Sequence, residues 1–427
     1  MKPDNQELQP TKNKIQNKKK ILLIALGLAI LLAGAVVATL LVTKKDNKES
    51  NSNQRSSNNQ NEVQQGEFAR QYSDRCEKKD SVSFTSYPIP MEQLGSIEPL
   101  GKVQDGHVTP TDHQYLAPLN SQAADNTTDV VMPADGKIVE IGAMPAQYIG
   151  DRQQQTAPED HRIVVSFSCQ YYSIFIHVHQ LAPALKDVVG DLQPNQSKQV
   201  DVKLSAGDKI GKIGGNPVDW TMLDTSKELS GFITPSLYQR ESWKIHTIDP
   251  TNLFTGDLKD KVIVKSLRST EPYGGKIDYD QAGKLVGNWF QEGTNGYEGV
   301  NMERYWDGHL SIAPDYIDAD STVISIGNWT GKADQFTVKS GPKPEEVTPS
   351  SGLVKYELTK RSYMAPNGQP WVESGLVKGI KLSKEGSTAG TILVQLDGGE
   401  KLKLEVFAGK TPNQVSAFTT NARTYTR

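Results

Sequence analysis

The sequence has few of the side chains that build metal clusters. Among its 427 residues are only two cysteines, Cys76 and Cys169, and seven histidines. A zinc ribbon or an iron–sulfur centre needs more thiolates than this, so both are excluded. The cysteines leave two interpretations open. They form a disulfide, which an environment outside the cytoplasm would favour, or they are two unpaired buried thiols.

The sequence also lacks a strong net charge. Its formal net charge is −3, and the six lysines among residues 1–20, against Asp4 and Glu7, leave about −7 from Ile21 onward. A weakly acidic remainder offers no basic face to a phosphate backbone, so we expect no nucleic-acid partner. The length is sufficient for two or more domains with cores of their own.

A long hydrophobic run occurs once, from Ile21 to Thr43. A helix rises 1.5 Å per residue, so a run of this length crosses a hydrocarbon core of about 30 Å. A signal peptide is the rival interpretation, but its apolar region usually has only about 7–15 residues. Lysines crowd the preceding residues, which favours a cytoplasmic N-terminus. The sequence therefore predicts a single-pass membrane protein with a cytoplasmic tail (1–20), a transmembrane helix (21–43) and an extracytoplasmic body.

Apolar side chains are almost absent from residues 44–66, so this stretch cannot offset the entropy of ordering and is predicted to be a disordered linker. From 67 to 267, short β-type runs alternate with Gly, Pro, Asn and Asp, which predicts a β-sandwich or hybrid-motif domain with one helix near 182–189. Residues 268–427 again read as regularly spaced strands, which predicts an antiparallel β-barrel-like domain. The predicted fold class is mainly β.

The candidate metal ligands fall in two short segments. His107, Asp112 and His113 lie in GHVTPTDHQYLAP, and His177 and His179 lie in IFIHVHQLAP. Imidazole and carboxylate are ordinary zinc ligands, and a catalytic zinc needs three of them and an open position for water. On a strand, His177 and His179 would face the same side, so both could reach one ion. A surface or hydrogen-bonded histidine is the simpler interpretation of each.

Five segments occur in a recognisable order: TDHQYLAP, VMPADGKIVEIG, IFIHVHQL, VKLSAGDKIGKIGG and IDPTNLF. This order resembles the lysostaphin-like zinc endopeptidases, whose domain carries a duplicated hybrid motif. The resemblance covers roughly residues 98–255. It is best in the PADGKIV turn and the GDKIGKIG segment, which are structural parts of that motif and which also resemble biotinyl-type hybrid folds.

The resemblance implies a zinc site, and the sequence departs from it at two places. Family members bind zinc with a His and an Asp four residues later, whereas His107 and Asp112 are five apart. His177, followed by Val178 and Leu181, matches the family's central histidine. The family's closing His-x-His strand is replaced by PVDWTMLD, which has no histidine, and His246 comes too late to substitute. The resemblance thus implies a degenerate, non-catalytic relative that uses no cofactor, with His177 and His179 as the candidates for any catalytic role.

We therefore expect a membrane-anchored cell-envelope protein whose peptidase-like domain binds or scaffolds at the cell wall or surface. Its partner would be a cell-wall polymer or an envelope protein. The alternative is an active zinc metallo-endopeptidase that cuts cell-wall peptide with a ligand set rearranged among the five candidates. A third hypothesis is a small ligand inside the C-terminal barrel, whose Gly-Asn-Trp triplets at 287–289 and 327–329 faintly resemble those of lipocalin and avidin barrels. The nearby Asp315, Asp318 and Asp320 are expected to form a solvated turn.

Overall fold

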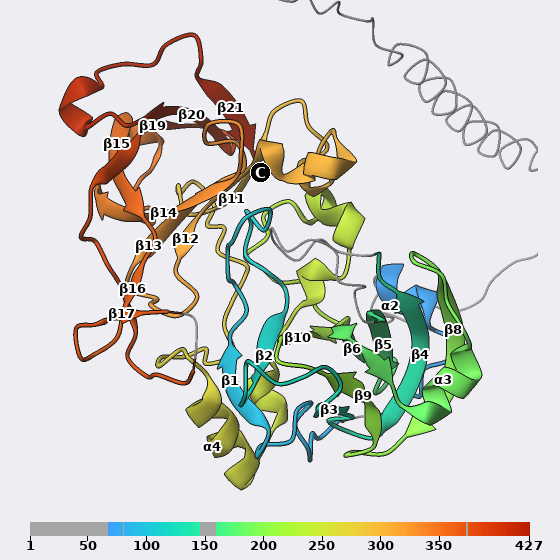
Figure 1. Cartoon of the computed structure of the whole chain (residues 1–427). Coiled ribbons are helices and arrows are strands. Elements are labelled where there is room, and N and C mark those ends of the chain that lie inside the picture. The colour runs from blue at the N-terminus through green and yellow to red at the C-terminus, as the bar shows by residue number, and fades with distance from the viewer. Residues whose placement is uncertain (1–66, 80, 146–158, 373–374) are drawn as a thin grey trace, which may run out of the picture. The chain divides into compact units, whose positions relative to one another are not determined.

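The computed structural model describes residues 67–427, except 80, 146–158 and 373–374. The predicted cytoplasmic tail, transmembrane helix and linker fall outside these residues. None of the helices in the described part has the length and apolar character of a membrane-crossing segment. That part is mainly β, as predicted, and contains two sheet systems in succession along the chain (Figure 1).

The first system is a seven-stranded antiparallel sheet in the order β1-β2-β10-β6-β5-β4-β8, with a small sheet β3-β9-β7 beside it. Its strands are β1 (Leu94–Glu98), β2 (Gln114–Pro118), β3 (Thr128–Val131), β4 (Gly136–Ala143), β5 (His161–Ser166), β6 (Tyr171–Val178), β7 (Gln180–Leu181), β8 (Ser197–Leu204), β9 (Lys209–Ile213) and β10 (Val218–Asp224). The helix expected near 182–189 is confirmed as α3 (Pro183–Val189). Its proline occupies the first turn, where a missing N–H costs nothing.

Strand β10 is buried at every position because both of its faces are covered. Val218, Trp220 and Met222 point into the main core, where the Trp220 indole stacks on Phe175 with ring centroids 6.2 Å apart. Leu223 points to the other face, on which α2 (Glu67–Gln71) packs through Phe68. Side chains alternate along a strand, so Asp219 shares this second face, called here the outer face.

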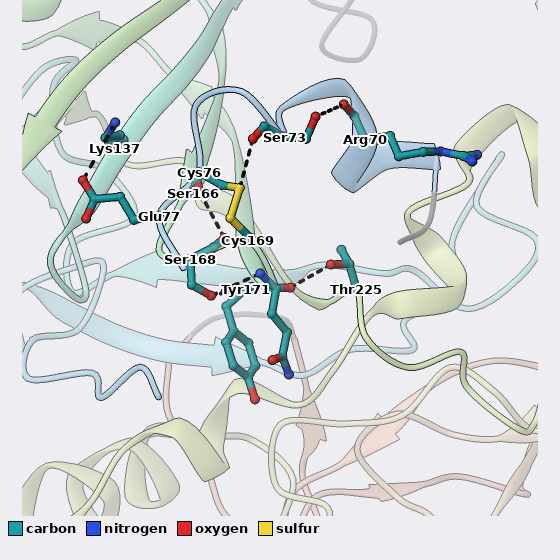
Figure 2. The surroundings of a disulfide bond; sticks show 11 residues. Arg70, Ser73, Cys76, Glu77, Lys137, Ser166, Ser168, Cys169, Tyr171 and Thr225 are labelled. Carbon is teal, nitrogen blue, oxygen red and sulfur yellow. Dashed lines mark hydrogen bonds and ion pairs between the residues drawn. A yellow bond between two sulfur atoms is a disulfide. The ribbon is translucent and has the colours of Figure 1, made fainter. Parts of the chain in front are cut away.

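A disulfide joins Cys76 to Cys169, so the first of the two interpretations of the cysteines is confirmed (Figure 2). Cys76 follows α2, and Cys169 lies in the turn between β5 and β6. The backbone N–H of Cys169 also donates to the carbonyl of Glu77 at 3.0 Å. The bond therefore fastens the segment that carries α2 to the outer face of the sheet.

The second system is a closed antiparallel barrel, which confirms the predicted barrel. Its strands are β11 (Gly287–Gln291), β12 (His309–Pro314), β13 (Thr322–Ile326), β14 (Asp334–Ser340), β15 (Leu353–Lys360), β19 (Thr388–Asp397), β20 (Lys401–Ala408) and β21 (Arg423–Thr426). A small sheet of β16 (Tyr363–Met364), β17 (Pro370–Trp371) and β18 (Lys381–Leu382) is inserted between β15 and β19. Closure pairs every strand edge of the barrel.

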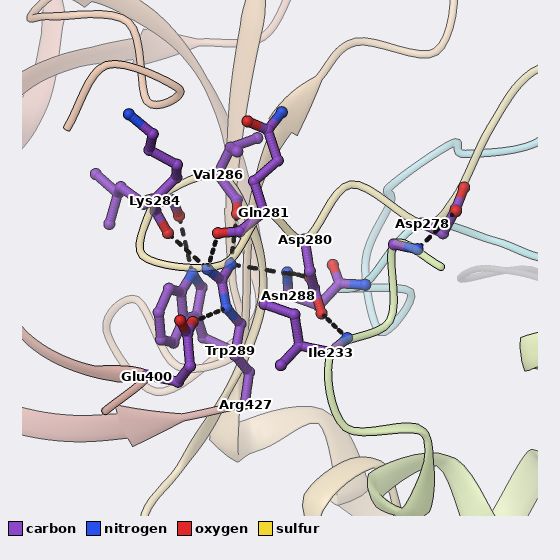
Figure 3. A network of polar contacts seen from close by, with 12 residues as sticks. Ile233, Asp278, Asp280, Gln281, Lys284, Val286, Asn288, Trp289, Glu400 and Arg427 are labelled. Carbon is purple, nitrogen blue, oxygen red and sulfur yellow. Dashed lines mark hydrogen bonds and ion pairs between the residues drawn. The ribbon is translucent and has the colours of Figure 1, made fainter. Parts of the chain in front are cut away.

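One end of the barrel is organised around Arg427 and Trp289 (Figure 3). The guanidinium carbon lies 4.0 Å from the centroid of the Trp289 ring, and the side chain is buried. Its nitrogens donate to the carbonyls of Gln281, Lys284 and Val286 and to the carboxylate of Glu400 at 2.5–2.7 Å. Glycine suits the first residue of this GNW triplet, because Gly287 has a φ of +129° and a Cβ there would lie 2.3 Å from Asp280 Oδ1 and 2.5 Å from the Arg427 guanidinium.

The expectation of a solvated aspartate turn after β12 is wrong for two of its three residues. Asp315 and Asp318 are buried. Asp315 accepts from the Tyr363 hydroxyl at 2.7 Å, and Asp318 accepts from the Leu382 backbone N–H at 3.0 Å. Burial is tolerated because these carboxylates are hydrogen-bonded to the inserted sheet, and they hold it against the barrel.

Candidate functional site

A pocket of about 720 Å³ opens on the outer face of the seven-stranded sheet. Its polar lining comes from Tyr115, Asp160, His177, His179, Lys186 and Asp219, among others. Strand register explains why these residues meet. Asp219 of β10 is directly opposite Tyr115 of β2 on one side and Ile176 of β6 on the other, so residues from three neighbouring strands form one row.

Asp219 lies between two imidazoles. Its Oδ2 atom is 3.4 Å from Nε2 of His113 and 3.7 Å from Nε2 of His177. His113 immediately precedes β2 and His177 is near the end of β6, so each reaches Asp219 from a neighbouring strand. Both distances exceed an ordinary hydrogen bond. The Asp219 carboxylate is therefore buried beside two histidines without a close partner.

His177 owes its orientation to its backbone and to Asp160. Its φ angle is +72°, a left-handed conformation that is uncommon for a side chain of this size. Its Nδ1 lies 2.8 Å from Oδ2 of Asp160, which leaves Nε2 for the pocket. The regular alternation of side chains along β6 ends at His177. The left-handed backbone at this residue accompanies the placement of His177 and His179 in one pocket.

His113 is oriented by Asp112, and Asp112 is in turn held from behind. Nδ1 of His113 lies 3.5 Å from Oδ1 of Asp112. The Trp243 indole N–H donates to the other oxygen of Asp112 at 2.7 Å, and Nζ of Lys244 donates to Oδ1 at 3.1 Å. Both carboxylate oxygens of Asp112 are thus engaged by the segment that carries η2 (Lys244–His246), and neither faces the pocket.

The cluster alternates acids and bases, and the alternation shifts their pKa values. Burial lowers the pKa of His177, but Asp160 and Asp219 raise it more, and the net pKa lies above the usual value. Burial also lowers the pKa of His113, but Asp219 and Asp112 raise it more, so the net pKa of His113 is raised as well. Burial raises the pKa of Asp219 itself, against the two imidazoles that lower it. Asp219 therefore raises the pKa of both imidazoles, and both imidazoles lower the pKa of Asp219.

The two remaining candidates lie beside this cluster. His179 lines the same pocket, but its Nδ1 faces Asp125 Oδ1 at 3.5 Å, and burial lowers its pKa. His107 is exposed, and its ring packs edge-on against the His113 ring with centroids 5.7 Å apart. Of the five predicted residues, the structure brings His113 and His177 to one carboxylate and places the others around them.

Sequence reasoning missed Asp219, Asp160 and Lys244. A signal for Asp219 is present in PVDWTMLD, because a carboxylate is able to face an imidazole. Asp160 and Lys244 offered no sequence signal. Each is distant in sequence from the histidine or aspartate that it contacts, so only the fold brings them together.

The ligand set expected for zinc does not fit the geometry as it stands. Among the residues that the structure describes, no group of three or more His, Cys, Asp or Glu side chains is arranged to hold a metal ion. Asp112, the carboxylate expected in that set, is fully engaged by Trp243 and Lys244. His179 faces away toward Asp125. We therefore derive no chemistry through a metal at this site.

No protein-family model matches the chain, and no curated protein matches it. Among solved structures, CbpA from L. salivarius REN is similar at 15% identity over 43% of this chain and 98% of that one, with a TM-score of 0.22. The NMR solution structure of lysostaphin is similar at 10% identity over 74% of this chain and 80% of that one, with a TM-score of 0.19. The antimicrobial peptidase lysostaphin from Staphylococcus simulans is similar at 12% identity over 83% of this chain and 88% of that one, with a TM-score of 0.18. At these TM-scores the likeness carries no argument about fold or function.

Proposed function

We propose that this chain is a cell-envelope protein whose outer-face pocket binds a peptide of the cell wall without cutting it. The observation that carries the proposal is the position of Asp219. In the lysostaphin-like pattern, the strand after the GDKIGKIG segment supplies closing histidines. Here the same segment supplies a carboxylate, which lies between the imidazoles of His113 and His177.

A binding role suits the chemistry of the pocket. Zinc-dependent hydrolysis needs three protein ligands and an activated water, and the arrangement around Asp219 offers no such set. A concave pocket of this volume with a few converging polar groups is typical of ligand sites. We infer that the pocket residues that match the peptidase-like pattern bind a ligand and do not catalyse its hydrolysis.

The cellular setting is part of the same proposal. Residues 21–43 would anchor the chain, with 1–20 in the cytoplasm and 44–66 as a tether, so that the β domains lie outside. The disulfide between Cys76 and Cys169 supports this setting, because such bonds persist in oxidising compartments. The partner would be a cell-wall polymer, or an envelope protein that carries a similar peptide.

The direct test is co-sedimentation of the full-length protein with purified peptidoglycan sacculi. We expect the wild-type protein to sediment with sacculi, and the variants Asp219→Asn and Asp160→Asn to remain largely in solution. Lys227→Ala is the matched control, because Lys227 is exposed and lies on a different part of the sheet domain. Equal sedimentation of all four proteins, or none by the wild type, would refute the proposal.

A second candidate function is zinc-dependent cleavage of cell-wall peptide. One observation favours it: two imidazole Nε2 atoms face the same oxygen of Asp219. Elemental analysis of the purified protein and of His177→Ala decides between the two functions. One zinc per chain, lost in the variant together with release of soluble peptide from sacculi, would replace binding by catalysis.

A further inference from the structure

We infer that the group recognised in this pocket is a primary ammonium, held between the carboxylates of Asp160 and Asp219. Such a group occurs at a free peptide N-terminus and at the end of a lysine-type side chain. The inference rests on the proposed function and deepens it, because it names the chemistry by which a wall peptide would be recognised.

The charges around the pocket are unevenly compensated. At the rim, Lys186 lies 3.1 Å from Glu159 and 3.0 Å from Asp191, so these two carboxylates already share a permanent cation. Deeper in the pocket, Asp160 lies 2.8 Å from the His177 imidazole, and Asp219 lies 3.4 Å and 3.7 Å from the imidazoles of His113 and His177. In the part of the chain that the structure describes, neither carboxylate has a lysine or arginine within ion-pair distance.

Asp112 is a buried carboxylate of the same domain, and its charge is compensated by a buried lysine. Its oxygens receive an indole N–H at 2.7 Å and the Lys244 ammonium at 3.1 Å. Lys244 is itself almost fully buried, so this ion pair is sealed inside the protein. Asp219 is buried to a similar degree but lacks such a cation. The imidazoles beside Asp219 compensate its charge only while they are protonated, so a ligand that supplies a permanent cation would be favoured there.

Two buried polar atoms next to the pocket make no hydrogen bond to the described residues. Oδ1 of Asp160 is buried and has no hydrogen-bond partner among the described residues, although Oδ2 of the same carboxylate is bonded to His177. Nε2 of His113 is also buried without a hydrogen bond, and the residue is 92% buried. This atom is aimed at Asp219. Two acceptor groups and an adjacent ring nitrogen thus converge where a donor is missing, and an ammonium has three donors and no acceptor.

The walls suit the rest of such a ligand. Met144, Pro145, Leu192, Pro194 and Pro217 line the same pocket as the two carboxylates. Apolar side chains can cover the methylenes of a lysine-type side chain, or the Cα groups of a short peptide, while the charged end reaches the floor. An anionic group is disfavoured, because it would meet the buried carboxylate of Asp219 and the partly buried one of Asp160, whereas the lysine among the described lining residues, Lys186, is at the rim.

The test is calorimetric titration of the full-length protein with the tripeptide Ala-Lys-Ala and three acetylated forms. One form has the α-amine acetylated, one the ε-amine, and one both. We expect the doubly acetylated peptide to bind at least about tenfold more weakly than the free one, since a charge-assisted hydrogen bond is worth about 1.5–3 kcal/mol. The singly acetylated forms identify which of the two amines enters the pocket.

Three variants make the test specific. Asp160→Asn and Asp219→Asn should each weaken binding of the free peptide about tenfold or more. Asp160 is only partly buried, so its variant is expected to fold even if the Asp219 variant does not. Lys227→Met should leave the affinity unchanged, because Lys227 is exposed and does not line the pocket.

The outcomes separate this inference from the proposed function. Equal affinity for all four peptides, or no measurable binding of any, would overturn ammonium recognition even if the protein still sediments with sacculi. Failure to sediment with sacculi while Ala-Lys-Ala binds would leave ammonium recognition standing and refute the cell-wall role. Stoichiometric binding of zinc chloride that Ala-Lys-Ala cannot displace would assign the two carboxylates to a metal and overturn the inference.

Discussion

Asp160 and His177 form the closest polar contact on the pocket floor, with 2.8 Å between Oδ2 and Nδ1. The contact fixes the imidazole so that its other nitrogen faces Asp219. Because Asp160 lies just before β5 and His177 near the end of β6, the pairing of these two strands holds both residues in place. The pairing of β5 with β6 thus positions this part of the pocket floor.

The first prediction is that Asp160→Asn lowers the pKa of His177. Burial lowers this pKa, and the hydrogen bond to Asp160 together with the charge of Asp219 raises it above the usual 6.5. Removing the Asp160 charge takes away part of the opposing effect. An NMR titration of the His177 ring signal measures the change, with Glu159→Gln as control because Glu159 contacts Lys186 and not His177. An unchanged His177 pKa in Asp160→Asn would contradict this reading of the contact.

The second prediction concerns the pH dependence of stability. His177 has a raised pKa in the folded protein, so its stabilising contribution is fully present below pH 6.5 and is lost as pH rises through the folded pKa. Asp160→Asn should therefore lower the free energy of unfolding most at acidic pH, with a smaller effect above neutrality. Asp219 also faces His177 and remains in both proteins. Chemical denaturation at a series of pH values tests the sign, and a loss that grows with pH would contradict it.

The third prediction is that Lys244→Met destabilises the protein by about 3–5 kcal/mol, the usual cost of breaking a buried ion pair from one side. Nζ of Lys244 lies 3.1 Å from Asp112 and 3.6 Å from Glu241, and the residue is 2% exposed. The substitution leaves the Asp112 carboxylate buried without its cation. The exposed Lys227→Met is the control, because an exposed pair contributes at most about 1 kcal/mol. Similar denaturation midpoints for the two variants would refute the assignment.

Much of the fold was predictable because it depends on local patterns. The barrel followed from evenly spaced strands and turn residues, and α3 lies where one helix was expected, near 182–189. The histidine segments were recognised because they are short and contiguous. These features need no knowledge of which strands are neighbours in the sheet.

The site itself could not be predicted, because it depends on register across strands that are distant in the sequence. Tyr115 and Asp219 are adjacent only because β2 pairs with β10. The burial of Asp315 was missed for a related reason: its partner Tyr363 belongs to an inserted sheet that follows a further three strands. A polar residue in a turn-like segment is expected to be solvated unless a distant donor covers it.

The fourth prediction concerns the disulfide. Cys76 and Cys169 are 93 residues apart, and in the chain-entropy model a loop of this size gives about 4–5 kcal/mol of stabilisation. Addition of a reductant should therefore lower the denaturation midpoint of the wild-type protein markedly. The double variant Cys76→Ala, Cys169→Ala should show the lower midpoint from the start and no response to reductant. A reductant effect in the double variant would mean that the loss has another cause.

The fifth prediction separates the charge of Arg427 from its shape. Arg427→Met removes the donors to three carbonyls and to Glu400, so we expect a loss of about 3–5 kcal/mol, comparable to breaking a buried pair. Arg427→Lys keeps the charge, but a lysine has no planar fork and cannot lie flat on Trp289 while reaching carbonyls on several sides. Its stability should therefore fall between those of the wild type and the methionine variant. Arg423→Met is the matched control, since Arg423 begins the same strand, β21, and is exposed. If Arg427→Lys were as stable as the wild type, charge alone would hold this end of the barrel, and the close fit at Gly287 would need another explanation.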